Sequence, residues 1–219
     1  MIDRPKPNIQ TRKRGTDPSM PRLLGDRLCL DFANTLESPR GEPEEFLHSY
    51  ADLVRWGRHV GILGDSEVKR LRHATGEQPG NAETVFKRAI ALRTAITRVF
   101  RAIAAGKDPS PDDLAVLQAE YLIALEHTHL ERQDDQFAWV WMDNDAIDRP
   151  LWDVARSAIA VLTQDDLRRV KECPGADDCG WLFFDTSKNA SRRWCSMEGC
   201  GSRVKMRHQY ARKRGMGGR

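Results

Sequence analysis

Four of the five cysteines lie close together near the C-terminal end of the 219-residue chain. They form two pairs, Cys173 with Cys179 and Cys195 with Cys200, and 15 residues lie between the pairs. Thiolates are soft ligands that satisfy tetrahedral Zn(II) at about 2.3 Å, and two nearby pairs can supply all four of them. The spacing therefore predicts one Zn²⁺ ion bound by Cys173, Cys179, Cys195 and Cys200.

There are three alternatives to zinc binding: the four cysteines could form two disulfides, bind an iron–sulfur cluster, or remain free thiols. Zinc is favoured because the surrounding stretch has too few large apolar residues to fold alone, whereas structural zinc supplies on the order of 10 kcal/mol of folding free energy. Four cysteine ligands leave no open coordination position, so this zinc is expected to be structural rather than catalytic. Its loss is expected to unfold residues 173–214 and to spare the rest. Cys29 stands apart and is predicted to be a buried structural thiol.

Charge is distributed unevenly along the chain, although the net charge is only +3. Residues 186–219 carry ten Lys or Arg against one acid, whereas residues 23–185 carry 19 basic against 29 acidic residues. A basic C-terminal segment on an otherwise acidic protein is typical of proteins that bind a polyanion. We therefore predict nucleic-acid contacts, with DNA favoured over RNA; docking on the acidic body and a solvated tail are the alternatives. The predicted contact residues are Lys188, Arg192, Arg193, Arg203, Lys205, Arg207, Arg212, Lys213 and Arg214.

The rest of the sequence predicts a mainly α fold with a small β-hairpin. Apolar periodicity and end signals indicate helices over 44–60, 65–72, 82–105, 111–126 and 150–162, with Asn81 capping the third. A capping box at Thr163 is expected to open a short helical turn. Residues 128–133 and 136–142 indicate the hairpin, and residues 23–36 are apolar but leave helix and strand undecided.

The C-terminal zinc module is predicted to be treble-clef-like: a short β-hairpin containing 181–184, then a basic helix over 203–214. The predicted organisation is a disordered basic arm (1–21), a helical domain (22–165), the zinc module (166–214) and a flexible tail (215–219). The longest apolar run, Phe137–Met142, is far too short to span a membrane. The first residues lack the apolar core of a signal peptide, so a cytoplasmic location is expected.

Two motifs resemble a known family. The C-terminal motif contains Cys173-Pro174, Asp178-Cys179-Gly180-Trp181-Leu182-Phe183, Asp185-Thr186-Ser187, Arg192-Arg193-Trp194-Cys195-Ser196-Met197 and Cys200-Gly201-Ser202-Arg203. It resembles the CGNR zinc finger, and 28–36 (LCLDFANTL) resembles the opening of the ABATE domain that precedes this finger. The resemblance implies a stress-induced transcription regulator. Ser202 stands where the name motif has Asn; because both side chains can bond nearby backbone, the zinc site is expected to survive.

The favoured function is a transcription regulator whose helical domain senses a small-molecule effector or forms a homodimer. We expect it not to be an enzyme, because no nucleophile elbow, phosphate loop or dinucleotide fingerprint occurs; His127 and His129, near Asp134, are expected to be solvated hairpin residues. The alternative is a small-molecule-binding protein or enzyme in which the zinc module only closes the fold. Three polar residues that interrupt an apolar segment are predicted to line a ligand pocket: Asp31, Asn34 and Thr35.

Overall fold

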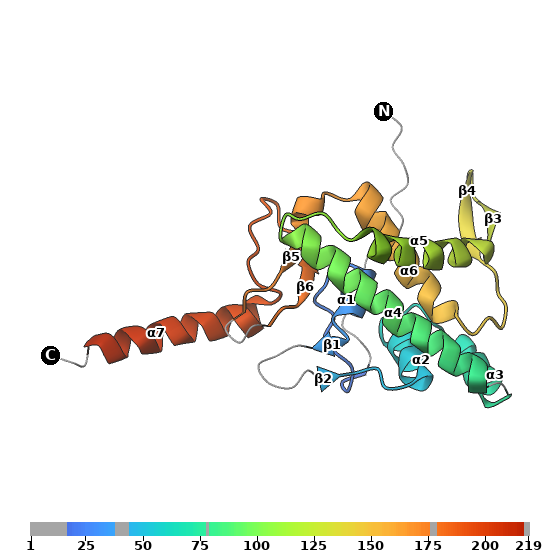
Figure 1. Ribbon diagram of the computed structural model, residues 1–219, viewed down its shortest axis with the longest axis horizontal. Helices are drawn as coiled ribbons and strands as arrows, with labels where there is room; N and C mark the ends of the chain where they lie inside the picture. Colours follow the sequence, from blue (N-terminus) through green and yellow to red (C-terminus); the bar gives the residue numbers. More distant parts are fainter. Residues whose placement is uncertain (1–16, 38–43, 78, 176–178, 217–219) are drawn as a thin grey trace.

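The computed structural model describes residues 17–37, 44–77, 79–175 and 179–216. Within these residues the fold is mainly helical, with three two-stranded antiparallel sheets (Figure 1). The elements in chain order are α1 (Leu28–Ala33), β1 (Leu36–Glu37), β2 (Glu44–Glu45), α2 (Tyr50–His59), α3 (Asp65–Glu77), α4 (Pro79–Ala104), α5 (Pro111–Glu126), β3 (Thr128–Gln133), β4 (Gln136–Trp141), α6 (Arg149–Gln164), the 3₁₀ turn η1 (Leu167–Arg169), β5 (Val170–Glu172), β6 (Leu182–Phe184), the π-helical turn η2 (Met197–Gly201) and α7 (Ser202–Met216).

The main core is built around α4, the longest helix. Its apolar side chains recur at helical spacing and are buried, because α1, α2, α5 and α6 pack against it. The predicted helix over 82–105 is thereby confirmed, but its start is earlier than expected. Asn81 does not cap the helix; it lies in the first turn, and Pro79 is the first helical residue. Proline fits this position because its missing N–H would have no partner there.

The short helix α1 explains why residues 23–36 could not be assigned from the sequence. All six of its residues are buried, since α4, α6 and β6 pack against it. A segment that is buried all round shows neither the helical nor the strand period, so periodicity alone cannot distinguish the two structures. The structure resolves the ambiguity in favour of helix.

The predicted helix over 44–60 is correct only in its second part. Residues Glu44–Glu45 pair with Leu36–Glu37 as a small sheet, and the helix begins at Tyr50. Ser49 sets this start, because its hydroxyl accepts a hydrogen bond from the backbone N–H of Asp52. The next helix, α3, also differs from the prediction, since it continues five residues beyond residue 72.

The hairpin and the two helices around it agree closely with the sequence. Ser110 precedes α5 with Pro111 at its first position, as expected. The strands β3 and β4 flank a two-residue turn at Asp134–Asp135. The predicted capping box at Thr163 is wrong, because α6 continues through that residue and its hydroxyl bonds the carbonyl of Ile159. Asp166 instead caps the following turn, η1.

Part of the predicted disordered arm is packed against the body. Met20 is buried in the main core. The backbone N–H of Asp17 donates to Nδ1 of His59 at 3.0 Å, and the Asp17 carboxylate lies 3.3 Å from the guanidinium of Arg55. Residues 17–21 are therefore held on α2. The remainder of the predicted arm, residues 1–16, lies outside the described residues, as does 217–219 of the predicted tail.

The hairpin of β5 and β6 belongs to two cores at once. Side chains of successive strand residues point to opposite faces. On one face, Leu182 and Phe184 join the main core beside α1 and α4. On the other face, Phe183 and the preceding Trp181 pack against the cysteine cluster. The zinc module and the helical domain therefore share one small sheet.

In the described part of the chain, no helix combines the length and the apolar character needed to cross a membrane.

Candidate metal centre and basic module

Two tight turns present the four cysteines. The first turn follows β5, where the N–H of Cys173 donates to the carbonyl of Trp181 at 2.8 Å and the N–H of Gly180 donates back to Cys173 at 3.1 Å. Gly180 has φ +63°, a conformation that costs glycine little. A Cβ on Gly175 would lie 2.7 Å from Cβ of Cys179, so only glycine fits this turn without displacing a neighbour.

The second turn is the π-helical turn η2 at the start of α7. The Ser196 hydroxyl accepts from the N–H of Gly199 at 3.1 Å and caps it. Cys195 precedes this turn and Cys200 lies within it, so both thiols face the first pair. Ser202 donates its hydroxyl proton to the carbonyl of Met197 at 3.0 Å. The serine at this position therefore binds local backbone, as expected from the sequence.

The geometry of the four sulfurs fits tetrahedral zinc. All four ligand atoms lie within 4.8 Å of one another. The sulfur of Cys195 lies 3.7 Å from those of Cys179 and Cys200. A tetrahedron with metal–sulfur bonds of about 2.3 Å has sulfur–sulfur edges of about 3.8 Å. A disulfide would instead need about 2.05 Å, so the cluster has the dimensions of a metal site.

The thiols of the cluster also influence one another's protonation. The thiols of Cys179 and Cys195 hydrogen-bond to the sulfur of Cys173 and lower its pKa. The same hydrogen bonds raise the pKa of Cys179 and of Cys195. Without a cation, four adjacent thiolates would repel one another strongly, whereas zinc favours the deprotonated form of every ligand.

The surroundings of the sulfurs suit a closed structural site. Three of the four thiols are buried and Cys179 is half-buried. Phe183, Trp181 and Trp194 form an apolar shell around them. The backbone N–H of Cys195 donates to the sulfur of Cys173 at 3.3 Å, which partly offsets the negative charge of a four-thiolate site.

Comparison with protein families decides what this arrangement is. Residues 26–165 match the ABATE family, which is described as "Putative stress-induced transcription regulator". Residues 169–213 match the CGNR zinc finger. The chain belongs to the ABATE family, with a CGNR zinc finger. Zinc is thus the cofactor of this module, and Cys173, Cys179, Cys195 and Cys200 are the residues that would hold it. A search of curated proteins finds no match.

Arg192 makes contacts inside the protein that the sequence did not predict. Its guanidinium pairs with the carboxylate of Asp26 and donates to the carbonyls of Cys195 and Leu24. It also lies over the ring of Phe183, 4.6 Å from the centroid. The contacts with Asp26 and Leu24 join the CGNR finger to the segment that leads into α1, whereas those with Cys195 and Phe183 lie within the finger. Arg192 is therefore a structural link between the two modules, and its contact with nucleic acid stays a prediction.

The loop that carries Arg192 is organised by Asp185, a residue of the family motif for which the sequence predicted no role. Its carboxylate accepts from the Ser187 hydroxyl and N–H, from the Arg192 N–H and from the ammonium of Lys171, which lies at 2.6 Å. Burial raises the pKa of Asp185, but these donors outweigh it and hold the pKa well below its usual range. An aspartate two residues before a serine, as in Asp185-Thr186-Ser187, is a turn signal that could have suggested this role.

The remaining predicted nucleic-acid residues lie on the loop before Cys195 and on α7. Lys188 and Arg193 are exposed on the loop, and Arg203, Lys205, Arg207 and Arg212 are exposed on the helix. Nη2 of Arg203 lies 3.8 Å from the sulfur of Cys200, so this residue also borders the metal site. Lys213 and Arg214 belong to α7, but their side chains lie outside the described part of the chain.

The three residues predicted to line a ligand pocket are buried and bonded inside the protein. Both amide atoms of Asn34 bind the backbone of Leu182: Nδ2 donates to its carbonyl at 2.9 Å and Oδ1 accepts from its N–H at 3.0 Å. Thr35 donates to the carbonyl of Phe32 and accepts from Arg93. Asp31 accepts from the N–H of residue 25 through one oxygen only. The Asn34 contacts hold the ABATE domain to β6; ligand binding by Asp31, Asn34 and Thr35 stays a prediction.

Replacing Asn34 with alanine should destabilise the protein by about 3 kcal/mol. The change leaves the buried N–H and C=O of Leu182 without partners on that edge of β6, and each unmade hydrogen bond costs roughly 1–3 kcal/mol. Urea unfolding of the zinc-bound protein measures the difference. Asn189→Ala, a change to an exposed loop residue, should have an effect within about 0.5 kcal/mol. Equal stability of the two variants would contradict the proposed link.

Proposed function

We propose that the chain is a transcription regulator that binds nucleic acid, DNA in preference to RNA, through α7 and the loop before Cys195. The observation that carries the proposal is the placement of α7. The helix extends away from the body (Figure 1) and is joined to it through the zinc-bearing turn. An α-helix of this kind is narrow enough to enter the major groove of B-DNA.

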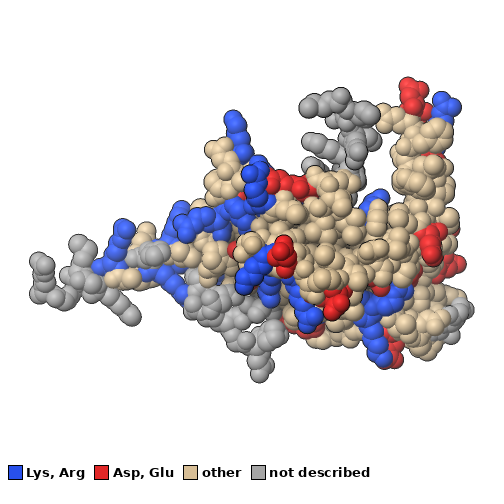
Figure 2. All heavy atoms as spheres, turned by 45° about the horizontal axis from the view of Figure 1, so that its top comes forward, with Lys and Arg blue, Asp and Glu red and all other residues tan. Residues whose placement is uncertain are grey.

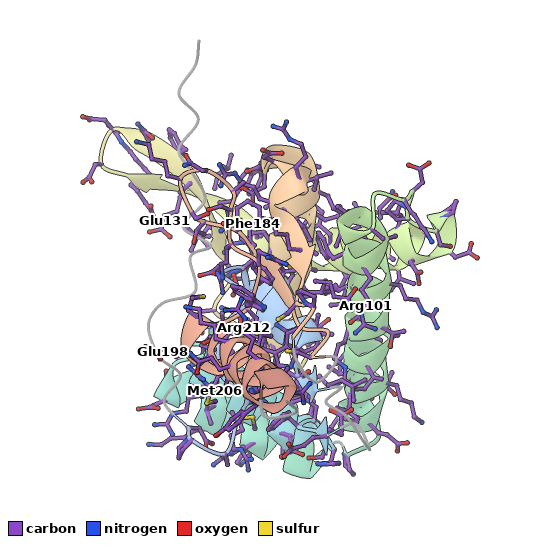
Figure 3. All side chains as sticks on the ribbon, turned by 90° about the vertical axis from the view of Figure 1, so that its left-hand side faces the viewer. Arg101, Glu131, Phe184, Glu198, Met206 and Arg212 are labelled. Atoms are coloured by element: carbon purple, nitrogen blue, oxygen red, sulfur yellow. The ribbon has the colours of Figure 1, made fainter. Side chains whose placement is uncertain are left out.

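The charge distribution supports this choice. On the face shown in Figure 2, basic side chains gather toward the end that carries α7. Figure 3 looks along that helix, with Met206 and Arg212 projecting from it and Glu131 lying apart on the β3–β4 hairpin. Lysine and arginine contacts to phosphates supply affinity without sequence preference. The acidic body should keep the rest of the molecule away from a polyanion.

We also propose that the protein is not an enzyme. Four cysteines fill the coordination sphere of zinc and leave no position for water or substrate. His127 stacks on Trp152, with ring centroids 4.3 Å apart, so its ring serves packing. In this proposal the ABATE domain senses an effector or forms a homodimer, and the regulator acts in the cytoplasm.

One observation favours the alternative function, in which the zinc module only stabilises the fold and does not bind nucleic acid. Leu182 and Phe184 complete the main core, so zinc stabilises more than the basic module. This structural role does not explain α7, which extends away from the body (Figure 1). Nucleic-acid binding is therefore the measurement that separates the two functions.

Binding of the zinc-loaded full chain to random duplex DNA should weaken steeply with salt. If about five phosphates are neutralised, log affinity should fall with log salt at a slope near −4 to −5. Neutralising Lys205 and Arg212 together, as Lys205→Gln with Arg212→Gln, should make the slope shallower by about two and lower affinity roughly 60-fold at 0.1 M salt. Fluorescence anisotropy with labelled DNA and RNA measures both quantities.

The matched control removes the same charge elsewhere. Lys69 on α3 and Arg132 on the hairpin are exposed and distant from α7 in the chain. Lys69→Gln with Arg132→Gln should leave the slope unchanged. Absence of binding at low salt by protein with a full equivalent of zinc would overturn the proposed function and favour the structural alternative.

A further inference from the structure

The β3–β4 hairpin has an apolar face that the described part of the molecule leaves uncovered. Strand pairing places Leu130 opposite Trp139 and Arg132 opposite Phe137. The exposed fractions are 70% for Phe137, 61% for Trp139 and 55% for Leu130. Only the base of this face is held, where Trp141 donates to the carboxylate of Asp153 and contacts Trp152. An isolated two-stranded hairpin is marginally stable in water. A binding partner that covers this apolar face would therefore stabilise the hairpin.

The outer edge of β4 is also open. The N–H of Met142 donates to the carbonyl of His127, which makes these two residues a hydrogen-bonded pair. Hydrogen-bonded and non-bonded pairs alternate along an antiparallel ladder. The N–H and C=O of Phe137 and Trp139 therefore point away from β3, and no backbone partner for them occurs among the described residues.

The composition of β4 leaves this edge unprotected against pairing. Natural edge strands are usually guarded by charges or proline. The strand Gln136–Trp141 contains neither, whereas β3 carries Glu131, Arg132 and His129. Only the β4 side of the hairpin thus combines an apolar face with an unguarded edge.

We propose that this edge and face bind the same surface of a second copy of the chain, so that two β4 strands pair antiparallel and form a four-stranded sheet. A two-fold axis that places Phe137 opposite the partner's Trp139 would satisfy the outward N–H and C=O groups of both strands. It would also bring aromatic side chains together across the strands, a favourable pairing in sheets. Symmetric pairing of one patch with itself is the commonest form of protein dimer.

The area is adequate for such a dimer. At about 150–250 Å² for a whole aromatic side chain, Phe137, Trp139 and Leu130 together leave on the order of 400 Å² uncovered. A stable interface buries about 800 Å² on each partner, a little over half of it apolar. The helix α5, which leads into β3, also carries exposed leucines: Leu114, Leu122 and Leu125.

The position of the hairpin fits the rest of the molecule. It projects from the end of the body opposite α7 (Figure 1). Pairing through β4 would leave both basic helices accessible. The dimer gives the ABATE domain one of the two roles named in the proposed function, but it is measured without nucleic acid and can fail independently of that function.

Sedimentation equilibrium of the zinc-loaded full chain tests the dimer. The mass should rise from 24.9 kDa toward about 50 kDa over roughly 1–200 µM protein. Trp139→Lys places a charge on the apolar face and should weaken association at least 100-fold. Gln133→Lys, on β3 and on the other face of the hairpin, is the matched control and should not weaken it. Circular dichroism and zinc content should be unchanged in both variants.

Two further readouts separate this dimer from other associations. The amide protons of Phe137 and Trp139 should become protected from hydrogen exchange as concentration rises, whereas that of Ala138, already bonded to β3, should not change. Added salt should weaken nucleic-acid binding but not this apolar contact. A monomer at 200 µM, or association that Trp139→Lys leaves intact, would overturn the proposal.

Discussion

Cys195→Ser should abolish zinc binding and unfold much more of the protein than the CGNR finger. The thiol is buried and its sulfur lies 3.7 Å from two of the other three ligand atoms. Structural zinc contributes on the order of 10 kcal/mol, which is comparable to the whole stability of a typical domain. The sequence alone predicted that residues 173–214 would unfold separately. The shared β5–β6 sheet changes that expectation.

The physical reason is that β6 cannot leave one core without leaving the other. Once the cysteine cluster is lost, Phe183 loses the cysteines that it packs against on its side of the strand. If β6 then detaches, Leu182 and Phe184 leave the main core, and each such loss costs roughly 2–5 kcal/mol. Asn34 and Arg192 lose their partners at the same time. We therefore expect the helical signal of the ABATE domain to be lost as well.

Elemental analysis and thermal unfolding measured by circular dichroism test this result together. The wild-type protein, purified without added metal, should hold one equivalent of zinc, and Cys195→Ser well under half. Cys29→Ala is the matched control, because it removes a buried thiol from α1 outside the cluster and should retain zinc. A normal helical melting transition in zinc-free Cys195→Ser would show that the ABATE domain folds without β6.

Asp31→Asn should stabilise the protein, and more so as the pH rises. Burial raises the pKa of Asp31 to about 7, with nearby Asp26 adding to the effect, while the hydrogen bond from Gly25 and the positive charge of Arg192 oppose it. One carboxylate oxygen has no hydrogen-bond partner. The ordinary pKa is 3.8, so the folded state holds a proton that the unfolded state releases.

The sign of the pH dependence follows from this difference. Between pH 4 and 7 the folded state binds more protons than the unfolded state, so wild-type stability falls as the pH rises and levels off above pH 7. Asparagine carries no charge at any pH. The stability gap in favour of Asp31→Asn should widen from about 2 kcal/mol at pH 5.5 to about 4 kcal/mol at pH 8.

Urea unfolding of zinc-loaded protein at several pH values measures the gap. Asp135→Asn, at the exposed tip of the hairpin, provides the comparison and should leave the wild-type pH profile unchanged. A gap for Asp31→Asn that stays constant from pH 5.5 to 8 would mean that Asp31 does not titrate in this range.

The sequence was sufficient for features that depend on local chemistry. The cysteine pairs identified the metal site, because four soft ligands in a stretch poor in apolar residues have few other uses. End signals such as Ser110-Pro111 placed α5, and the break at Asp134–Asp135 placed the hairpin. The uneven charge marked the basic module. In each case the residues that carry the signal are neighbours in the chain.

Sequence reasoning did not reach the contacts that a residue makes with a distant segment. Arg192 and Arg193 are identical in type and adjacent, yet only Arg192 is tied to Asp26 and Leu24, which the fold brings beside it. Asn34 and Thr35 suggested a pocket because polar groups in an apolar segment need partners. Their partners are the backbone of Leu182, 148 residues away, and Arg93 on α4.

The sequence by itself determined the ligands of the zinc, the type of most helices and the location of the basic charge. Only the tertiary structure decided that β6 serves two cores, that Arg192 joins the modules and that the apolar face of the hairpin stays open. The alternation of side chains along β6 says that the strand has two faces but not what covers each of them. That assignment depends on contacts between segments far apart in the chain, which no local pattern encodes.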